Sequence, residues 1–164
     1  MPNDLLTIPA TNAFLDYLIQ ERHFSKYTAR CYGVDLRQFL DWILESENIT
    51  PNESLEKDAF ESIKTGILTS NNDSVTITQR LLNAKTEDIR NFLAILAEQN
   101  YSPATMARKI ASLRSFYRWA EKRRLSKQNP MIMIRTPKQN RKLPKAISVE
   151  DVERILAAPD ASTL

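Results

Sequence analysis

Apolar residues recur at steps of three and four in four separate stretches of the chain. The first two stretches run from about Asn12 to Glu21 and from about Lys26 to Glu45. The third begins near Thr86 and the fourth at Ser102. This spacing is typical of amphipathic helices, whereas half-buried strands alternate with a period of two. The chain also has only 2 glycines in 164 residues, so sheet-type turns are scarce and the pattern predicts an all-α fold.

Local signals indicate where these helices begin. Ser25 is a predicted N-cap for the second helix and Thr86 for the third. In the fourth helix, Ser102 can act as the cap, and Pro103 fits the first helical position because its missing N–H is not needed there. The segment that starts at Ser148 resembles a capping box and predicts one more helix, ending near Ala158.

The fourth helix is predicted to have two unlike faces. Its apolar stripe consists of Met106, Ile110, Leu113, Tyr117 and Ala120. At about 100° per residue, the opposite side and its flanks carry Thr105, Arg108, Lys109, Ser112, Ser115 and Arg118. We therefore expect this helix to bury one face and to expose a cationic face that carries hydroxyl groups. The aromatic residues expected in the core are Trp42, Phe116, Tyr117 and Trp119.

Residues 46–85 show a weaker pattern. Loop signals surround one possible short helix from Leu55 to Leu68. We expect this stretch to be an insert between the second and third helices of the core.

Positive charge is concentrated in one part of the chain. Residues 101–145 carry 13 basic side chains and 1 acidic side chain, a net charge of +12, whereas the whole chain has a net charge of only +3. A merely solvated surface usually mixes both signs. A segment of one sign predicts a polyanionic partner, for which nucleic acid is the main candidate.

Other functional chemistry has little support in the sequence. Cys31 and His23 are the only cysteine and histidine, so we expect no disulfide and no metal or other cofactor, and we interpret both as structural or surface residues. No apolar run approaches the ~20 residues that cross a bilayer, and the N-terminus lacks the features of a signal peptide. We therefore expect a cytoplasmic protein with no membrane partner. The sequence contains neither a nucleophile and base at a recognisable spacing nor a glycine-rich phosphate loop, so it gives no indication of catalysis.

The candidate nucleic-acid contacts lie at two helix starts and in the linker after the fourth helix. Helix N-termini attract phosphate through unpaired N–H groups, and arginine can hold phosphate or guanine. Two simpler interpretations stay open: Ser25 and Ser102 are sufficiently explained as caps, and an isolated Arg-Lys pair is usually solvated. The candidates are Ser25, Thr28 and Arg30 in the second helix, Thr105, Arg108, Lys109 and Ser112 in the fourth, and Lys138, Arg141, Lys142 and Lys145 in the linker.

Three segments resemble the core-binding domain of tyrosine recombinases of the phage-integrase type. The segment Phe24–Ile43 has the pattern S-x-x-T-x3-Y-x2-DL-x2-F-x2-W. The segment Tyr101–Met131, followed by Thr136–Ser148, is similar to the fourth helix of the family and its P-K…LPK linker. Residues 86–93 resemble the helix between them. The order of the three segments is most similar to Xer-type recombinases.

The resemblance implies a SAM-like four-helix bundle that forms half of a C-shaped clamp around double-stranded DNA. Helices two and four of the family face the major groove. The catalytic residues of the family belong to a separate C-terminal domain and have no counterpart in this chain, and neither Tyr101 nor Tyr117 is the nucleophile. The positions that match family contacts are Thr28, Arg30, Cys31, Thr105, Arg108, Lys109 and Ser112.

From these observations we expect a tail (1–11), a SAM-like domain (12–130), a basic linker (131–145) and the start of a catalytic domain (146–164). The predicted partner is the recombination core site. The chain itself is expected to be a monomer without enzymatic activity, with full-length protomers assembling on DNA. Two alternatives remain: a stand-alone DNA-binding regulator, and a basic helical module that binds an acidic protein.

Overall fold

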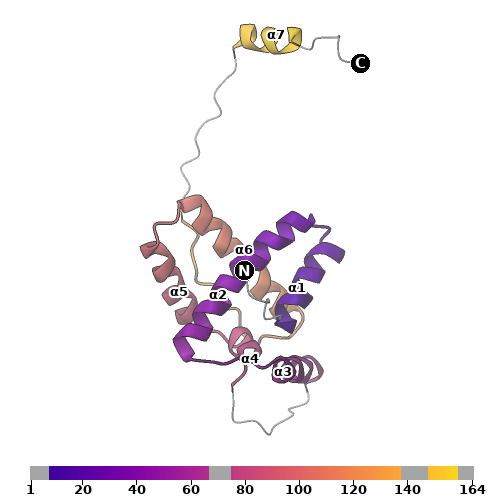
Figure 1. Cartoon of the computed structure of the whole chain (residues 1–164), viewed down its shortest axis with the longest axis vertical. Helices are drawn as coiled ribbons and strands as arrows, with labels where there is room; N and C mark the ends of the chain where they lie inside the picture. The colour runs from indigo at the N-terminus through magenta and orange to yellow at the C-terminus, as the bar shows by residue number, and fades with distance from the viewer. Residues whose placement is uncertain (1–7, 67–74, 138–147, 159–164) are drawn as a thin grey trace.

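The computed structural model describes residues 8–66, 75–137 and 148–158, and these residues form helices and no strands (Figure 1). The expected all-α fold is therefore confirmed. The first six helices share one hydrophobic core. The four helices expected from the sequence correspond to the first, second, fifth and sixth helices of the structure. The helices are α1 (Pro9–Gln20), α2 (Lys26–Glu47), α3 (Glu53–Thr65), α4 (Ile77–Leu82), α5 (Thr86–Glu98), α6 (Pro103–Lys122) and α7 (Val149–Ala157).

Three predicted serine caps are confirmed. The hydroxyl of Ser25 accepts the backbone N–H of residue 28 at 3.1 Å, and that of Ser102 accepts the N–H of residue 105 at 3.2 Å. Ser148 accepts the N–H of residue 151 at 3.1 Å. Each cap satisfies one of the donors that a helix start leaves unpaired and contributes about 1 kcal/mol.

Thr86 is the first residue of α5 and not its cap. Lys85 occupies the N-cap position, and its backbone N–H donates to the Asp88 carboxylate at 2.7 Å. The Thr86 hydroxyl instead donates to the carbonyl of Pro130 at 3.1 Å, which ties α5 to the turn after α6. The prediction of Thr86 as the cap was wrong because its hydroxyl serves a tertiary contact that the local sequence does not reveal.

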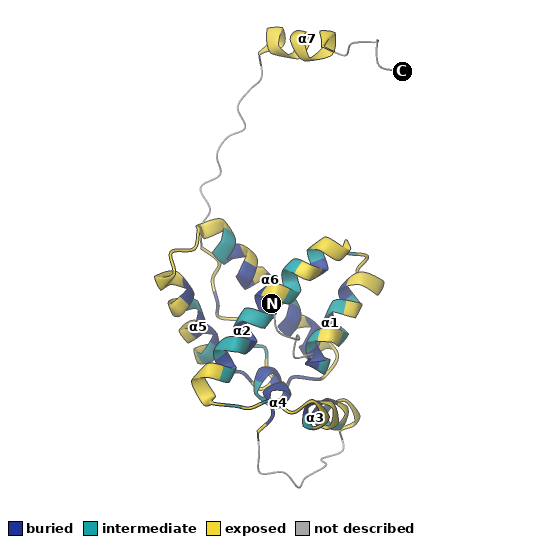
Figure 2. Cartoon of the chain, viewed as in Figure 1, coloured by how far each residue is buried: buried dark blue, intermediate teal, exposed yellow. Residues whose placement is uncertain are grey.

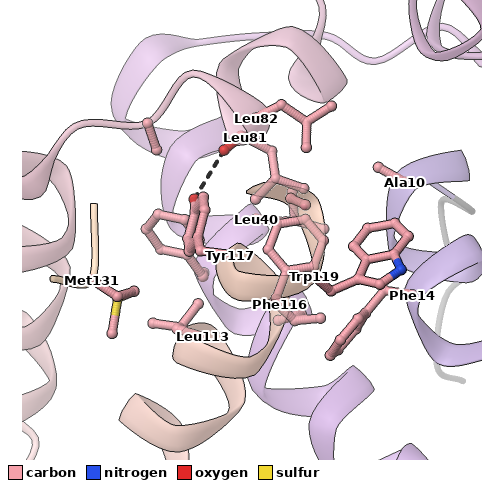
Figure 3. Packing of buried hydrophobic residues seen from close by; sticks show 14 of the residues in the cluster. Ala10, Phe14, Leu40, Leu81, Leu82, Leu113, Phe116, Tyr117, Trp119 and Met131 are labelled. Carbon is pink, nitrogen blue, oxygen red and sulfur yellow. Dashed lines mark hydrogen bonds between the residues drawn. The ribbon is translucent and has the colours of Figure 1, made fainter. Parts of the chain in front are cut away.

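An aromatic cluster joins α1 to α6 (Figure 3). The ring of Phe14 lies 5.4 Å from that of Phe116 and 5.5 Å from that of Trp119, centroid to centroid. Tyr117 is fully buried, and its hydroxyl donates to the carbonyl of Leu81 in α4 at 2.9 Å. Burial raises the pKa of the Tyr117 phenol. The core positions predicted for Phe116, Tyr117 and Trp119 are confirmed.

The rest of the predicted α6 stripe is also largely buried (Figure 2). Ile110, Leu113 and Ala120 are buried, whereas Met106 is only half-buried. Trp42 is half-buried as well and stacks on Phe39, with the ring centroids 5.8 Å apart. The helical periodicity therefore identified the apolar face that packs into the core.

The described residues of the expected insert contribute side chains to the core. Its predicted helix is α3, which begins and ends slightly earlier than expected. The short helix α4 was not predicted, yet Ile77, Leu81 and Leu82 are each at most 1% exposed. Glu56 of α3 is also buried, and its carboxylate accepts the backbone N–H groups of Ile77 at 2.9 Å and Thr78 at 2.8 Å. An acidic side chain from one helix thus caps the next one.

Residues just outside the expected SAM-like domain also pack into the core. Ile8 and Ala10 are buried in the core, so the bundle begins before residue 12. Met131 and Ile134 are buried as well, so the first residues of the expected linker pack on the bundle. Residues 138–145 lie outside the described part of the chain.

The last predicted helix is present as α7. All of its residues are exposed (Figure 2), including the apolar side chains of Val149, Val152 and Ile155. It therefore contributes nothing to the core of the bundle.

Candidate nucleic-acid interface

A buried carboxylate joins α2 to α6. Asp35 of α2 is only 1% exposed. It accepts hydrogen bonds from Nη1 of Arg108 at 2.5 Å, from Nζ of Lys109 at 3.2 Å and from the hydroxyl of Ser112 at 2.7 Å. Burying a carboxylate is costly unless charged and polar donors surround it. Here three donors from one helix meet that need, so the two helices are held in one relative position.

Lys109 is shielded on its other side by polar and aromatic groups. Its ammonium donates to Oε1 of Gln38 at 2.5 Å and lies 5.1 Å from the ring centroid of Tyr101. The amide of Gln38 in turn donates to the Tyr101 hydroxyl at 3.2 Å. With 7% of its side chain exposed, Lys109 faces the α2–α6 junction and not solvent.

Arg108 differs from Lys109 because its side chain is 44% exposed. Among the described residues, only Nη1 has partners: the Asp35 carboxylate and, in a weaker contact at 3.5 Å, the carbonyl of Cys31. A guanidinium group has five N–H donors in a rigid plane. Arg108 is therefore anchored at one nitrogen and keeps further donors available at the surface.

The two helices begin with the same arrangement of hydroxyl groups. Ser25 and Thr28 place their side-chain oxygens 2.8 Å apart, and Ser102 and Thr105 place theirs 2.9 Å apart. Ser25 is exposed, whereas Thr28 and Thr105 are half-buried. Helix capping is sufficient to explain these contacts. The hydroxyl groups also lie beside the backbone N–H groups of the helix N-termini, where an anion is favoured.

The surface positions predicted for Lys109 and Ser112 were wrong. Both are buried, and Ser112 is 0% exposed. The periodicity of α6 identified the core stripe correctly, but α2 covers a second side of the helix. The reason is Asp35 of α2, whose buried carboxylate draws both residues into the junction.

An exposed stripe on α2 borders this junction. Arg30 is exposed, as predicted, and Cys31 is half-buried. Tyr27 and Val34, whose exposed fractions are 76% and 58%, were not predicted from the sequence. They lie three residues before and four residues after Arg30, which is the spacing of one helix face. That spacing could have identified the stripe.

Most of the other cations in the described part of residues 101–145 are exposed. Arg114 is an exception, because it donates to the Ile134 carbonyl at 2.9 Å and to the Thr136 hydroxyl at 3.1 Å. Arg123 pairs with Glu21. The predicted contacts Lys138, Arg141, Lys142 and Lys145 lie outside the described residues. Within the described ranges, the exposed cations without an ion pair include Arg118, Lys122, Arg124, Lys127 and Arg135.

The described residues include no group of three or more His, Cys, Asp or Glu side chains that could hold a metal ion. In the same residues, every helix is too short or too polar to cross a membrane.

Comparison with known proteins adds independent evidence. The family model described as "Phage integrase, N-terminal SAM-like domain" matches residues 11–62 and 72–124. Tyrosine recombinase XerD of Listeria innocua is 32% identical over 161 residues, which is 98% of this chain and 43% of the relative. Tyrosine recombinase XerC of Natranaerobius thermophilus is 32% identical over 97% of the chain and 42% of the relative. XerC of Anoxybacillus flavithermus is 26% identical over 93% and 41%.

The chain spans about two fifths of the length of these relatives. No solved structure gives a significant match. The family model nevertheless covers well over half of the chain, including α2 and α6. The chain therefore belongs to the family of N-terminal SAM-like domains of phage integrases.

Proposed function

We propose that this chain binds double-stranded DNA through the adjoining surfaces of α2 and α6. The observation that carries the proposal is the junction itself, where Arg108 is anchored by Asp35 and still 44% exposed. Arg30 lies on the neighbouring stripe of α2, exposed and without an ion pair among the described residues. Arginines with free planar donors can bind phosphate or the edge of guanine.

The proposed contact set combines the two helix starts with the exposed stripes. Helix N-termini and hydroxyl groups would position the duplex, while arginine side chains add charge. Lys109 and Ser112 are excluded from direct contact because they are buried. The linker residues Lys138, Arg141, Lys142 and Lys145 would neutralise further phosphates. The contacts proposed on the helices are Ser25, Tyr27, Thr28, Arg30, Cys31, Val34, Thr105, Arg108 and Arg118.

We also propose that the chain is the DNA-binding part of a longer, cytoplasmic tyrosine recombinase. The support comes from relatives that are more than twice as long and are named tyrosine recombinases. In this proposal, residues outside the chain cut and rejoin DNA, and α7 begins the domain that carries them. The chain binds one core site as a monomer, and full-length protomers assemble on DNA.

The experiment is a fluorescence-anisotropy titration of labelled duplex DNA at several salt concentrations, with acidic polypeptide as a competitor. We expect binding that weakens steeply with salt, since each neutralised phosphate adds roughly 0.9 to the slope of log affinity against log salt. Absence of binding even at low ionic strength would overturn the proposal. Displacement by polyglutamate as readily as by unlabelled duplex would favour an acidic protein as the partner.

A further inference from the structure

We infer that Asp35 is a positioning residue for DNA binding: it orients Arg108 toward the duplex while itself remaining buried. The inference rests on the proposed DNA-binding function and adds a residue that has no access to DNA. Its carboxylate is 0% exposed, so any effect on a bound duplex has to pass through its partners.

Both carboxylate oxygens of Asp35 have partners on α6. Oδ2 accepts from Arg108 at 2.5 Å and from Ser112 at 2.7 Å, while Oδ1 accepts from Lys109 at 3.2 Å. Ser112 and Lys109 are buried and fix the carboxylate from within. Arg108 is the one partner of the three that reaches the surface. A flexible side chain is thereby held at one nitrogen before any ligand arrives, which lowers the entropy lost on binding.

Asp35 lies on a face of α2 that adjoins the exposed stripe of the candidate interface. Cys31, Asp35 and Gln38 follow one another at steps of four and three and all contact Arg108 or Lys109. Val34 and Arg30 lie on the adjoining exposed stripe. A shift of Arg108 away from Asp35 would therefore change the surface next to Arg30.

Electrostatics alone makes the opposite prediction. Removing a negative charge from a DNA-binding surface lowers the repulsion of phosphate, so Asp35→Asn should tighten binding if the residue acts only through its charge. If Asp35 acts by positioning Arg108, the same substitution weakens binding. The sign of the change distinguishes the two.

The test compares the affinity of wild-type chain, Asp35→Asn and Asp41→Asn for one duplex at one salt concentration. Asp41 offers a matched control, because it is a carboxylate on the same helix that forms an ion pair with Arg37 of α2 itself. We expect Asp35→Asn to bind about tenfold more weakly and Asp41→Asn to bind no more weakly than wild type. Equal or tighter binding by folded Asp35→Asn would overturn the inference.

Two further variants keep the test decisive if Asp35→Asn fails to fold. Asp35→Asn with Lys109→Met removes the buried pair together and leaves the net charge unchanged, so a loss of affinity cannot follow from charge. Arg108→Lys keeps the surface charge but lacks the planar fork that can hold Asp35 and DNA at once. We expect both to bind about tenfold more weakly with unchanged circular dichroism, and wild-type affinity in both would overturn the inference.

A double-mutant cycle identifies the route of the effect. The background is the double variant Asp35→Asn, Lys109→Met, to which Arg108→Ala is added. If Asp35 acts through Arg108, the added substitution weakens DNA binding no further. Fully additive losses would show that Asp35 does not act through Arg108. Failure of wild-type chain to bind DNA at all would instead overturn the proposed function, so the two failures are distinguishable.

Discussion

Asp35 and Lys109 form a buried ion pair that connects α2 to α6, with 3.2 Å between Oδ1 and Nζ. The two residues are 74 positions apart in the sequence. Their side chains are 0% and 7% exposed. Removing one partner of such a pair leaves the other charge buried without compensation, whereas removing both is often nearly neutral.

We therefore predict that Asp35→Asn lowers the free energy of unfolding by about 3 kcal/mol. Adding Lys109→Met to it should recover part of that loss, because the stranded ammonium is removed as well. Urea unfolding followed by circular dichroism measures both. A double variant less stable than Asp35→Asn would contradict the prediction.

The buried carboxylate of Glu56 provides a second stability test. It accepts two backbone N–H groups at the start of α4, and an amide has only one oxygen to offer. We expect Glu56→Gln to lower the free energy of unfolding by about 1–3 kcal/mol. Glu53→Gln is the control, since Glu53 lies on the same helix but is exposed and forms a surface ion pair with Lys57; it should change stability by less than about 0.5 kcal/mol.

Acid unfolding should depend on Asp88. Burial opposes the charged form, but hydrogen bonds from Arg80 and from the backbone of Lys85 hold the pKa of Asp88 below its ordinary value of 3.8. A lowered folded-state pKa stabilises the fold at pH values above the unfolded-state pKa, and this stabilisation is lost as the pH falls through the folded-state pKa. The advantage of wild type over Asp88→Asn should thus be full above about pH 5 and shrink towards pH 2. Stability curves that stay parallel over this range would refute the assignment.

The hydrogen bond from Tyr117 to Leu81 links α6 to α4 inside the core. The Leu81 carbonyl also accepts the backbone N–H of Ala84 at 3.4 Å, so it keeps one partner when the Tyr117 hydroxyl is removed. We expect Tyr117→Phe to cost about 1 kcal/mol in thermal or urea unfolding. Tyr27→Phe, at a ring that is 76% exposed, should leave stability within about 0.5 kcal/mol of wild type.

Local sequence signals were sufficient for the parts of the fold that depend on neighbours along the chain. The serine caps of α2, α6 and α7 and the apolar stripe of α6 follow from spacing within a few residues. The helix α4 was missed because six residues are too few for a periodic pattern. Its stability comes instead from burial of Ile77 and Leu81 and from the carboxylate of Glu56.

The candidate site could be predicted only in part. Arg30 and Arg108 were identified from charge and helix face, and both reach the surface. Lys109 and Ser112 were misplaced because their partner lies on another helix, beyond the reach of any pattern within α6. An acidic residue such as Asp35 ordinarily faces water, and its burial depends on tertiary packing.

The central claim is that the exposed cations of α2 and α6 neutralise DNA phosphates, and the salt dependence of binding tests it most directly. Arg30 and Arg118 are exposed without an ion pair in the described residues, whereas Arg37 and Lys57 pair with carboxylates of their own helices. Two double variants therefore lose the same charge from different surfaces. The first pair combines Arg30→Ala with Arg118→Ala, and the second combines Arg37→Ala with Lys57→Ala. We predict that the first pair reduces the slope of log affinity against log salt by roughly 1.8, from 0.9 for each phosphate contact, and that the second leaves it nearly unchanged. Equal slopes for both pairs would contradict the account.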